Sequence, residues 1–380
     1  MTGRPSNWEG AREILCVRLD SVGDVVMTGP AMRALREAVP GRRITLLTSP
    51  SGAGAGELLP FVDDVLSYEA PWMKAAGARS SPAPDERLIA QLGERRIDAA
   101  AIFTVYSQSP LPAALTCHLA GIPLRLAHCR ENPYSLLTDW VAEPEPDELV
   151  RHEVRRQLDL VAAVGAQVKD ERLSLAVSPV AHEHVAAVLA QLGLDGARRW
   201  TVVHPGSTAS SRRYPPESYV EVCTELSERH DVGILFTGDE QERELVDSIR
   251  AQLGRDVPSL AGELELAELA ALLSAAPLLV AGNTGPVHLA AAVGTPVVDL
   301  YALTNPQHVP WGVPSRVLFQ DVPCRWCYKS RCPEGHHRCL RGVMPHEVTS
   351  AVVELLEGGD GFVPGDFGKA LPWQTPRPNE

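Results

Sequence analysis

No stretch of this 380-residue chain approaches the roughly 18 uninterrupted apolar residues that a membrane-spanning helix needs. Its first residues also show neither the basic nor the apolar segment of a secretory signal. We therefore expect a cytoplasmic protein with no transmembrane segment.

Basic charge is scarce as well. Lysine and arginine together number 35 against 48 aspartates and glutamates, which gives a formal net charge of −13. A polyanion would meet a repulsive average field, and the 5% of aromatic residues form no aromatic–basic motif that would offset it. Nucleic acid is therefore not the expected partner.

Cysteine, with eight residues, is too sparse for a disulfide scaffold. Four of the eight nevertheless fall within sixteen residues: Cys324, Cys327, Cys332 and Cys339. Four soft ligands in one loop fit a structural zinc site, and near one zinc per chain is the expectation. The spacing also fits another metal cluster, one or two disulfides, or free thiols.

Short apolar runs alternate with helical patterns through two successive parts of the chain. The expected strands span residues 14–19, 44–48, 65–68, 98–104, 201–204, 232–236, 278–281 and 297–301. The expected helices span residues 30–38, 87–94, 111–119, 150–164, 182–192, 216–229, 240–253, 266–274, 287–293 and 345–356.

This alternation predicts an α/β protein with parallel sheets covered by helices on both faces. The length allows two full-sized cores. We expect two Rossmann-like domains, residues 1–178 and 179–357, facing across a cleft. Residues 358–380 are expected to be a loosely attached tail.

Site residues are expected in loops that follow strands, because ligands of open α/β sheets bind at the carboxyl ends of the strands. The first such loop, residues 18–24, offers two carboxylates and a glycine. Asp24 lies where a helix should begin, so an N-cap role competes with a catalytic one.

The loop of residues 204–215 is rich in hydroxyls and ends in two arginines. Ser207, Thr208 and Arg212 are groups that phosphate oxygens favour, although a plain solvated loop would look similar. After the next strand, Glu240 or Glu242 could accept hydrogen bonds from a ribose diol, or could simply complement a helix dipole.

The segment Gly282-Asn-Thr-Gly-Pro-Val-His288 is the most informative loop. It follows an apolar strand and begins an alanine-rich helix. Because the N–H groups of a helix start bind anions, we expect it to bind a diphosphate. Gly285 allows close backbone approach, Thr284 offers a hydroxyl, and His288 offers a donor unless it is an ordinary helix residue. Together these loops predict a nucleotide diphosphate in the second domain and a group-transfer reaction.

These loops resemble glycosyltransferase family 9, the ADP-heptose heptosyltransferases with the two-domain GT-B fold. The resemblance is carried by residues 23–40, 204–217 and 283–304 and extends from about residue 14 to 356. It implies an inverting, metal-independent transfer from a nucleoside-diphosphate sugar, with ADP favoured, to an acceptor held mainly by the first domain.

By this resemblance, Asp24 is the general base and Arg212 stands where the family usually has a phosphate-binding lysine. Glu240 matches the ribose-binding acid and Leu264 lies near the adenine. Thr284, Gly285 and His288 match the diphosphate-binding turn. Ser207, Thr208 and Arg212 would neutralise the leaving diphosphate, so that no catalytic metal is required.

Asn283 departs from the family's common Asp-Thr-Gly, and Tyr214 replaces a tryptophan. The nucleotide and sugar therefore stay open, as does the acceptor: lipopolysaccharide core, another glycan or an antibiotic aglycone. Residues 106–109 and 128–133 are either acceptor loops or plain surface. Two alternatives compete with the transferase: a GT-B-fold nucleotide-sugar epimerase or hydrolase, and a nucleotide-sugar-binding protein without catalysis.

Overall fold

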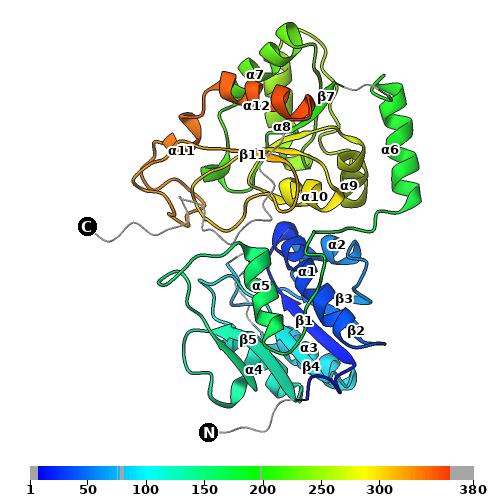
Figure 1. The fold of residues 1–380 in the computed structure, drawn as a ribbon, viewed down its shortest axis with the longest axis vertical. Coiled ribbons are helices and arrows are strands. Elements are labelled where there is room, and N and C mark those ends of the chain that lie inside the picture. The colour runs from blue at the N-terminus through cyan, green and yellow to red at the C-terminus, as the bar shows by residue number, and fades with distance from the viewer. Residues whose placement is uncertain (1–6, 75, 78–80, 197–198, 360–380) are drawn as a thin grey trace. The chain divides into compact units, whose positions relative to one another are not determined.

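The computed structural model describes residues 7–74, 76–77, 81–196 and 199–359 (Figure 1). The chain divides into two compact units between Ser174 and Leu175, four residues before the boundary expected from the sequence. Most of the expected tail, residues 360–380, lies outside the described part.

The first unit is built on six parallel strands in the order β3-β2-β1-β4-β5-β6 (Figure 1). They are β1 (Glu13–Arg18), β2 (Arg43–Thr48), β3 (Asp64–Ser67), β4 (Ala99–Ile102), β5 (Leu124–Cys129) and β6 (Asp139–Ala142). The inner strand β1 is buried along nearly its whole length, which is why it is almost continuously apolar.

Helices cover both faces of this sheet. The first group, α1 (Val22–Ala38), α2 (Pro50–Glu57) and α5 (Glu153–Ala162), packs together. The second group, α3 (Ala83–Glu94) and α4 (Leu111–Leu119), adds Leu88, Leu92 and Cys117 to an apolar cluster that contains Leu15 and Val17 of β1. The carboxyl ends of the strands are left for loops.

The second unit has five parallel strands in the order β11-β10-β9-β7-β8. They are β7 (Trp200–His204), β8 (Gly233–Phe236), β9 (Leu279–Gly282), β10 (Val297–Leu300) and β11 (Ser315–Leu318). Its helices are α6 (Pro179–Gln191), α7 (Pro216–Arg229), α8 (Arg243–Gln252), α9 (Leu266–Ala275), α10 (Gly285–Val293), α11 (Arg338–Arg341) and α12 (Pro345–Leu356).

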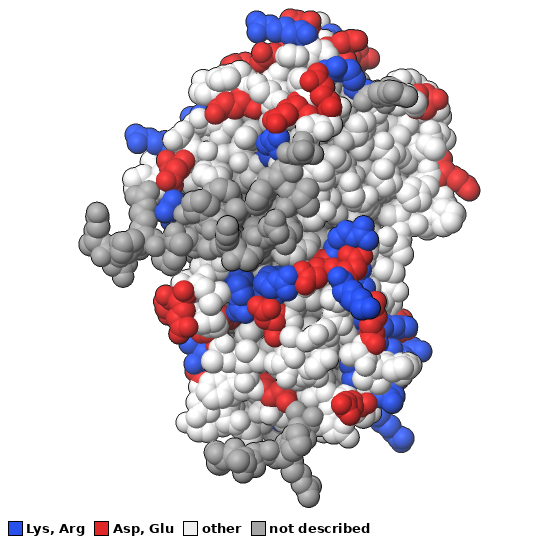
Figure 2. Space-filling view, viewed as in Figure 1, with Lys and Arg blue, Asp and Glu red and all other residues white. Residues whose placement is uncertain are grey.

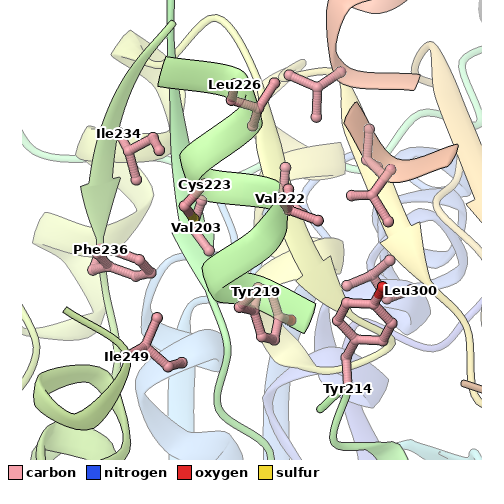
Figure 3. Close-up of a cluster of buried hydrophobic side chains, with 14 of the residues drawn as sticks. Val203, Tyr214, Tyr219, Val222, Cys223, Leu226, Ile234, Phe236, Ile249 and Leu300 are labelled. Carbon is pink, nitrogen blue, oxygen red and sulfur yellow. The ribbon is translucent and has the colours of Figure 1, made fainter. Parts of the chain in front are cut away.

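The core of the second unit lies between its sheet and helices α7, α8 and α12. Tyr219, Val222 and Leu226 of α7 belong to one buried apolar cluster with Phe236 and Leu300 of the strands (Figure 3). The spacing of these α7 residues, three and four apart, puts them on one helix face. Helices α6, α9 and α10 pack together as a second group.

The α/β fold class is confirmed, and the eight expected strands are present with ends shifted by at most two residues. Strands β5, β6 and β11 and helix α2 were not expected. Arg125 and His128 interrupt the apolar run of β5, β6 begins with Asp139, and β11 carries an arginine. Helix α2 contains three glycines, which disfavour helix in isolation.

The expected start of the first helix at Pro30 is wrong. Helix α1 begins at Val22, and Pro30 lies inside it. Its N-cap is Ser21, so Asp24 is the third helical residue and not the cap. Its side chain accepts a hydrogen bond from the Ser21 backbone N–H at 3.2 Å, in a capping-box arrangement.

Charge is mixed over the surface that Figure 2 shows. Basic and acidic side chains are interspersed there among the residues that the structure describes. No helix in the described ranges is long and apolar enough to cross a membrane.

Candidate active site

Arg18, the last residue of β1, organises the carboxyl edge of the first sheet. Its fully buried guanidinium pairs with three carboxylates. The distances are 3.0 Å from Nε to Asp20, 3.1 Å from Nη2 to Asp24, and 2.7 Å from Nη1 to Glu153 of α5. One cation thus faces three acids that come from a strand end, a helix start and a distant helix.

Asp24 is held in place from two sides. Its Oδ1 accepts the bond from Arg18, and its Oδ2 accepts hydrogen bonds from the backbone and the hydroxyl of Ser21. The carboxylate is therefore fixed in orientation while its side chain stays 16% exposed. An oriented, accessible carboxylate is what a general base requires.

Asp20 has an unusual proton affinity. Burial raises its pKa from 3.8 to about 6, and the charges of Asp24 and Glu153 add to the shift. The charge of Arg18 and a hydrogen bond from Gln108, at 2.8 Å, oppose it. Three carboxylates share one guanidinium, and their mutual repulsion favours protonation of one of them. The raised pKa makes Asp20 that carboxylate.

Two neighbouring cavities lie at this edge of the first unit, of about 430 and 500 Å³. Asp24 lines the larger one, and the two share lining residues that include Asp20, Met73, Lys74 and Gln108. A cavity of this size can hold a sugar-sized ligand beside the Asp24 carboxylate. Residues 106–109 and 128–133, for which the sequence left acceptor loops and plain surface loops open, jointly line a third cavity of about 150 Å³.

In the second unit, the loop after β7 is packed onto Glu242. A Cβ on Gly206 would lie 1.9 Å from the Glu242 carboxyl carbon, so a side chain there would displace that carboxylate. Nε2 of the buried His204 lies 3.3 Å from Glu242. Burial disfavours charge on Glu242, but the hydrogen bond and charge of His204 hold its pKa below the ordinary value.

The predicted phosphate-binding residues follow in this loop. Ser207 is buried and its hydroxyl donates to the Ala209 carbonyl at 3.2 Å, whereas Thr208 is exposed. Arg212 ends the short helix η2 (Ser210–Arg212), and its Nη1 donates to the Asn283 carbonyl at 3.5 Å. The structure therefore brings Arg212 to the predicted diphosphate-binding turn.

The turn at the start of α10 lies close under the Arg212 backbone. A Cβ on Gly282 would lie 2.9 Å from the Arg212 carbonyl oxygen. Thr284 is the N-cap of α10 and Gly285 its first residue, with His288 buried one turn in. The free N–H groups of a helix start are suited to phosphate oxygens.

The expected ribose- and adenine-binding residues lie in two loops joined by Arg243. Glu240, in η3 (Glu240–Glu242), is 74% exposed and pairs with Arg243 at 2.8 Å. Arg243 also donates to the Gly262 carbonyl at 3.3 Å, two residues before the half-buried Leu264. Glu240 is thus more open to a ligand than Glu242. The Glu242 carboxylate pairs with His204 and accepts a hydrogen bond from the Asp239 N–H.

The cysteine-rich loop supports the Arg212 loop. The Ser211 hydroxyl donates to the Lys329 carbonyl at 2.7 Å, and the Ser211 N–H donates to Ser330 at 3.1 Å. The four cysteines are half-buried free thiols, with Cys324 Sγ 3.8 Å from Nε2 of His336. Across the described residues, which include these four, no three His, Cys, Asp or Glu side chains form a group that could hold a metal ion.

Several residues of these sites had no assigned role in the sequence analysis. Arg18 and His204 each end a strand, which was the available signal, but nothing local marks their partners. Glu153 lies 135 residues from Arg18 and Glu242 lies 38 from His204. Only the fold brings these pairs together.

Two units with parallel sheets, a fixed carboxylate on one and phosphate-suited loops on the other, define an α/β protein of the GT-B glycosyltransferase type. Similar solved structures share this fold. A family 9 glycosyl transferase from Veillonella parvula has a TM-score of 0.78 at 19% identity, covering 92% of this chain and 98% of that one. E. coli ADP-heptose lps heptosyltransferase II has a TM-score of 0.71 at 23% identity, covering 91% and 99%.

The sequence comparisons agree. Lipopolysaccharide heptosyltransferase 2 of Escherichia coli is 26% identical over 355 residues, 90% of this chain and 98% of its own length. Lipopolysaccharide core heptosyltransferase OpsX of Haemophilus influenzae is 23% identical over 78% of this chain and 81% of its own length. The sequence model of glycosyltransferase family 9 (heptosyltransferase) matches residues 86–337. The chain belongs to this family and is a glycosyltransferase.

Proposed function

We propose that this enzyme transfers a heptose-like sugar from ADP-heptose to an acceptor hydroxyl of the lipopolysaccharide core, with inversion at the anomeric carbon and without a catalytic metal. The observation that carries the proposal is the carboxylate of Asp24, held by Arg18 and Ser21 beside a cavity of about 500 Å³. The relatives supply the donor and acceptor: one is named for ADP-heptose and others for lipopolysaccharide.

In the proposed mechanism, Asp24 removes the proton of the acceptor hydroxyl as its oxygen attacks the anomeric carbon. Arg212, the hydroxyls of Ser207 and Thr208, and the N–H groups at the start of α10 stabilise the leaving ADP. Asn283, Thr284, Gly285 and His288 complete the diphosphate site, with Glu240 on the ribose and Leu264 beside the adenine. These donor residues all lie within residues 86–337, which the family model matches, whereas Asp24 lies before them.

Calorimetric titration with ADP, GDP, UDP and dTDP, without added metal, tests the donor site. ADP should bind selectively, and Arg212→Ala should weaken it by one to two orders of magnitude, because a hydrogen bond to a charged group contributes roughly 1.5–3 kcal/mol. Arg229→Ala is a matched control, since that side chain is 75% exposed on α7. Equal and weak binding of all four nucleotides would refute the proposed donor site.

Transfer itself is tested by incubating the enzyme with ADP-heptose and a core acceptor in the presence of a chelator. A product with inverted anomeric configuration, assigned by its proton coupling in NMR, is expected. Retained configuration would refute inversion, and loss of activity with chelator would refute metal independence. ADP release without acceptor would favour the hydrolase alternative.

The cysteine-rich loop gives a separate proposal, a structural zinc that takes no part in catalysis. The spacing of the four cysteines supports this proposal. Their side chains, as placed among the described residues, do not form a metal site. Metal analysis of protein purified without chelator should find near one zinc per chain. Finding none would remove zinc and leave the loop as a support for Arg212 through Lys329 and Ser330.

A further inference from the structure

One of the two large cavities in the first unit has no part in the proposed mechanism. The cavity of about 500 Å³ is lined by Asp24, and we call it the base cavity. Its neighbour, of about 430 Å³, is lined by Trp72, and we call it the tryptophan cavity. The residues that line both are Leu19, Asp20, Met73, Lys74 and Gln108. A ligand longer than one sugar ring can therefore extend from one cavity into the other.

The lining of the tryptophan cavity comes from loops at the carboxyl edge of the sheet. Asp20 follows β1, Trp72 follows β3 and Gln108 follows β4. This is the edge at which ligands of open parallel sheets bind. Each of the two cavities also lies within the usual volume range of ligand pockets, about 300–1,000 Å³. Position and size therefore both suit a bound ligand.

Trp72 gives this cavity an apolar wall. Its side chain is half-buried and packs against the apolar cluster of the first unit. Its ring lies beside that of Tyr68, with centroids 6.0 Å apart, and the Tyr68 hydroxyl donates to Asp85 at 2.6 Å. The Trp72 ring is thus supported from behind. A supported aromatic ring that lines a cavity offers a flat apolar surface, against which the C–H groups of a sugar ring can pack.

Asp20 and Gln108 give the same cavity fixed polar groups. Nε2 of Gln108 donates to Oδ1 of Asp20 at 2.8 Å, and Oδ2 of Asp20 lies 3.0 Å from Nε of Arg18. A carboxylate can accept more hydrogen bonds than these two, and an amide has a second N–H and a carbonyl oxygen. Sugar hydroxyls both donate and accept, so an adjacent carboxylate and amide suit them.

Arg18 connects the two cavities through its ion pairs. Its Nε pairs with Asp20, which lines both cavities, and its Nη2 pairs with Asp24, which lines the base cavity, at 3.0 and 3.1 Å. The guanidinium nitrogens have a fixed planar geometry, so the two carboxylates keep a constant spacing. A sugar bound at Asp20 therefore sets where the next sugar meets Asp24.

We propose that the tryptophan cavity is a second sugar subsite for the acceptor. It holds the sugar residue linked to the one that receives the heptose, with Trp72 against the ring face and Asp20 and Gln108 on the ring hydroxyls. The inference rests on the proposed function, because Asp24 marks the hydroxyl that is attacked. It deepens that function by defining the substrate class, an acceptor of at least two linked sugar residues.

The test compares two acceptors in steady-state transfer from ADP-heptose. One is core oligosaccharide released from lipopolysaccharide, and the other is the methyl glycoside of the single sugar that receives the heptose. The wild type should have a KM about tenfold lower for the oligosaccharide, because only this acceptor fills the second subsite. Equal KM values would overturn the subsite, whether or not any variant folds.

Trp72→Ala should raise the KM for the oligosaccharide by about tenfold and so remove most of this preference. Trp72→Phe keeps an aromatic ring and should recover most of it. Trp140→Ala is the matched control, since that tryptophan is 49% exposed on β6 of the same unit. A wild-type preference in Trp72→Ala, or an equal loss in the control, would overturn the role of Trp72.

Calorimetry with the oligosaccharide and no donor separates the subsite from the proposed function. Wild-type binding that Trp72→Ala weakens, without any transfer, would support the subsite and overturn the proposed reaction. Transfer that does not depend on the second sugar would support the reaction and overturn the subsite. The absence of both binding and transfer would overturn both.

Discussion

Arg18 shows how a single buried residue sets the chemistry of the first unit. Its guanidinium fixes Asp24 and also pairs with Asp20 and Glu153. A charge buried to this degree persists only because its partners surround it. Arg18 also lowers the pKa of Asp20, but burial and the neighbouring charges of Asp24 and Glu153 outweigh it and keep that pKa above its ordinary value.

Replacing Asp24 with asparagine should reduce kcat by roughly 100- to 10,000-fold and leave ADP affinity unchanged, because a general base contributes that much to turnover and does not bind the donor. Steady-state rates and calorimetry on the same preparation check both parts. Asp256→Asn is the control, since that side chain is fully exposed. A variant that keeps wild-type kcat would exclude Asp24 as the base.

Asp20→Asn should change the pH dependence of stability. The folded pKa of about 6 lies above the ordinary 3.8, so between these values the folded protein holds a proton that the unfolded chain has lost. Wild-type stability therefore falls as pH rises through this window, by up to about 3 kcal/mol, and the variant should not show the fall. Denaturant unfolding at pH 4, 5, 6 and 7 measures the difference; parallel curves would contradict the shift.

At the scale of structural elements, the loop after β7 is held by contacts along its length. Gly206 lets the chain pass against the Glu242 carboxylate, and Tyr214 then anchors the loop by donating its hydroxyl to the Val343 carbonyl at 2.8 Å. Ser211 adds the contacts to Lys329 and Ser330. Arg212 is thus presented by a loop attached at both of its sides.

Gly206→Ala should therefore weaken ADP binding and lower the melting temperature, because its Cβ would overlap Glu242 and break the His204 pair. Gly93→Ala in α3 is the matched control. Its Cβ would meet only the Ala120 carbonyl, at an ordinary 3.6 Å. The control should gain up to about 1 kcal/mol of stability from helix propensity, and equal behaviour of the two variants would refute the steric argument.

For the whole molecule, the division into two units with separate cores places the proposed base on one unit and the donor loops on the other. Nucleotide binding should stabilise the unit that holds the donor loops by about 2.7 kcal/mol at a hundredfold excess over Kd.

Hydrogen exchange with and without ADP should therefore show protection in residues 204–213 and 283–289 of the second unit. Residues 18–24 of the first unit should change little with ADP alone, since ADP leaves the acceptor region empty. Protection centred on the first unit would reassign the nucleotide site.

Most of the fold could be predicted because parallel strands buried on both faces are apolar in the sequence itself, as in β1, β7 and β9. The prediction failed where local chemistry conflicts with the final structure. Pro30 suggested a helix start but lies within α1. The three glycines of α2 disfavour helix, so the sequence did not predict this helix, which packs on α1.

The sequence by itself determined the α/β class, the two-part organisation and the loops that carry Asp24, Arg212 and Thr284, since each follows from local pattern. Only the tertiary structure decided the partners. The pairing of Arg18 with Glu153, the packing of Gly206 on Glu242 and the burial of Asp299 without a hydrogen bond join segments distant in the chain. Charge and proton affinity depend on distance and burial in space, which residue spacing along the chain does not encode.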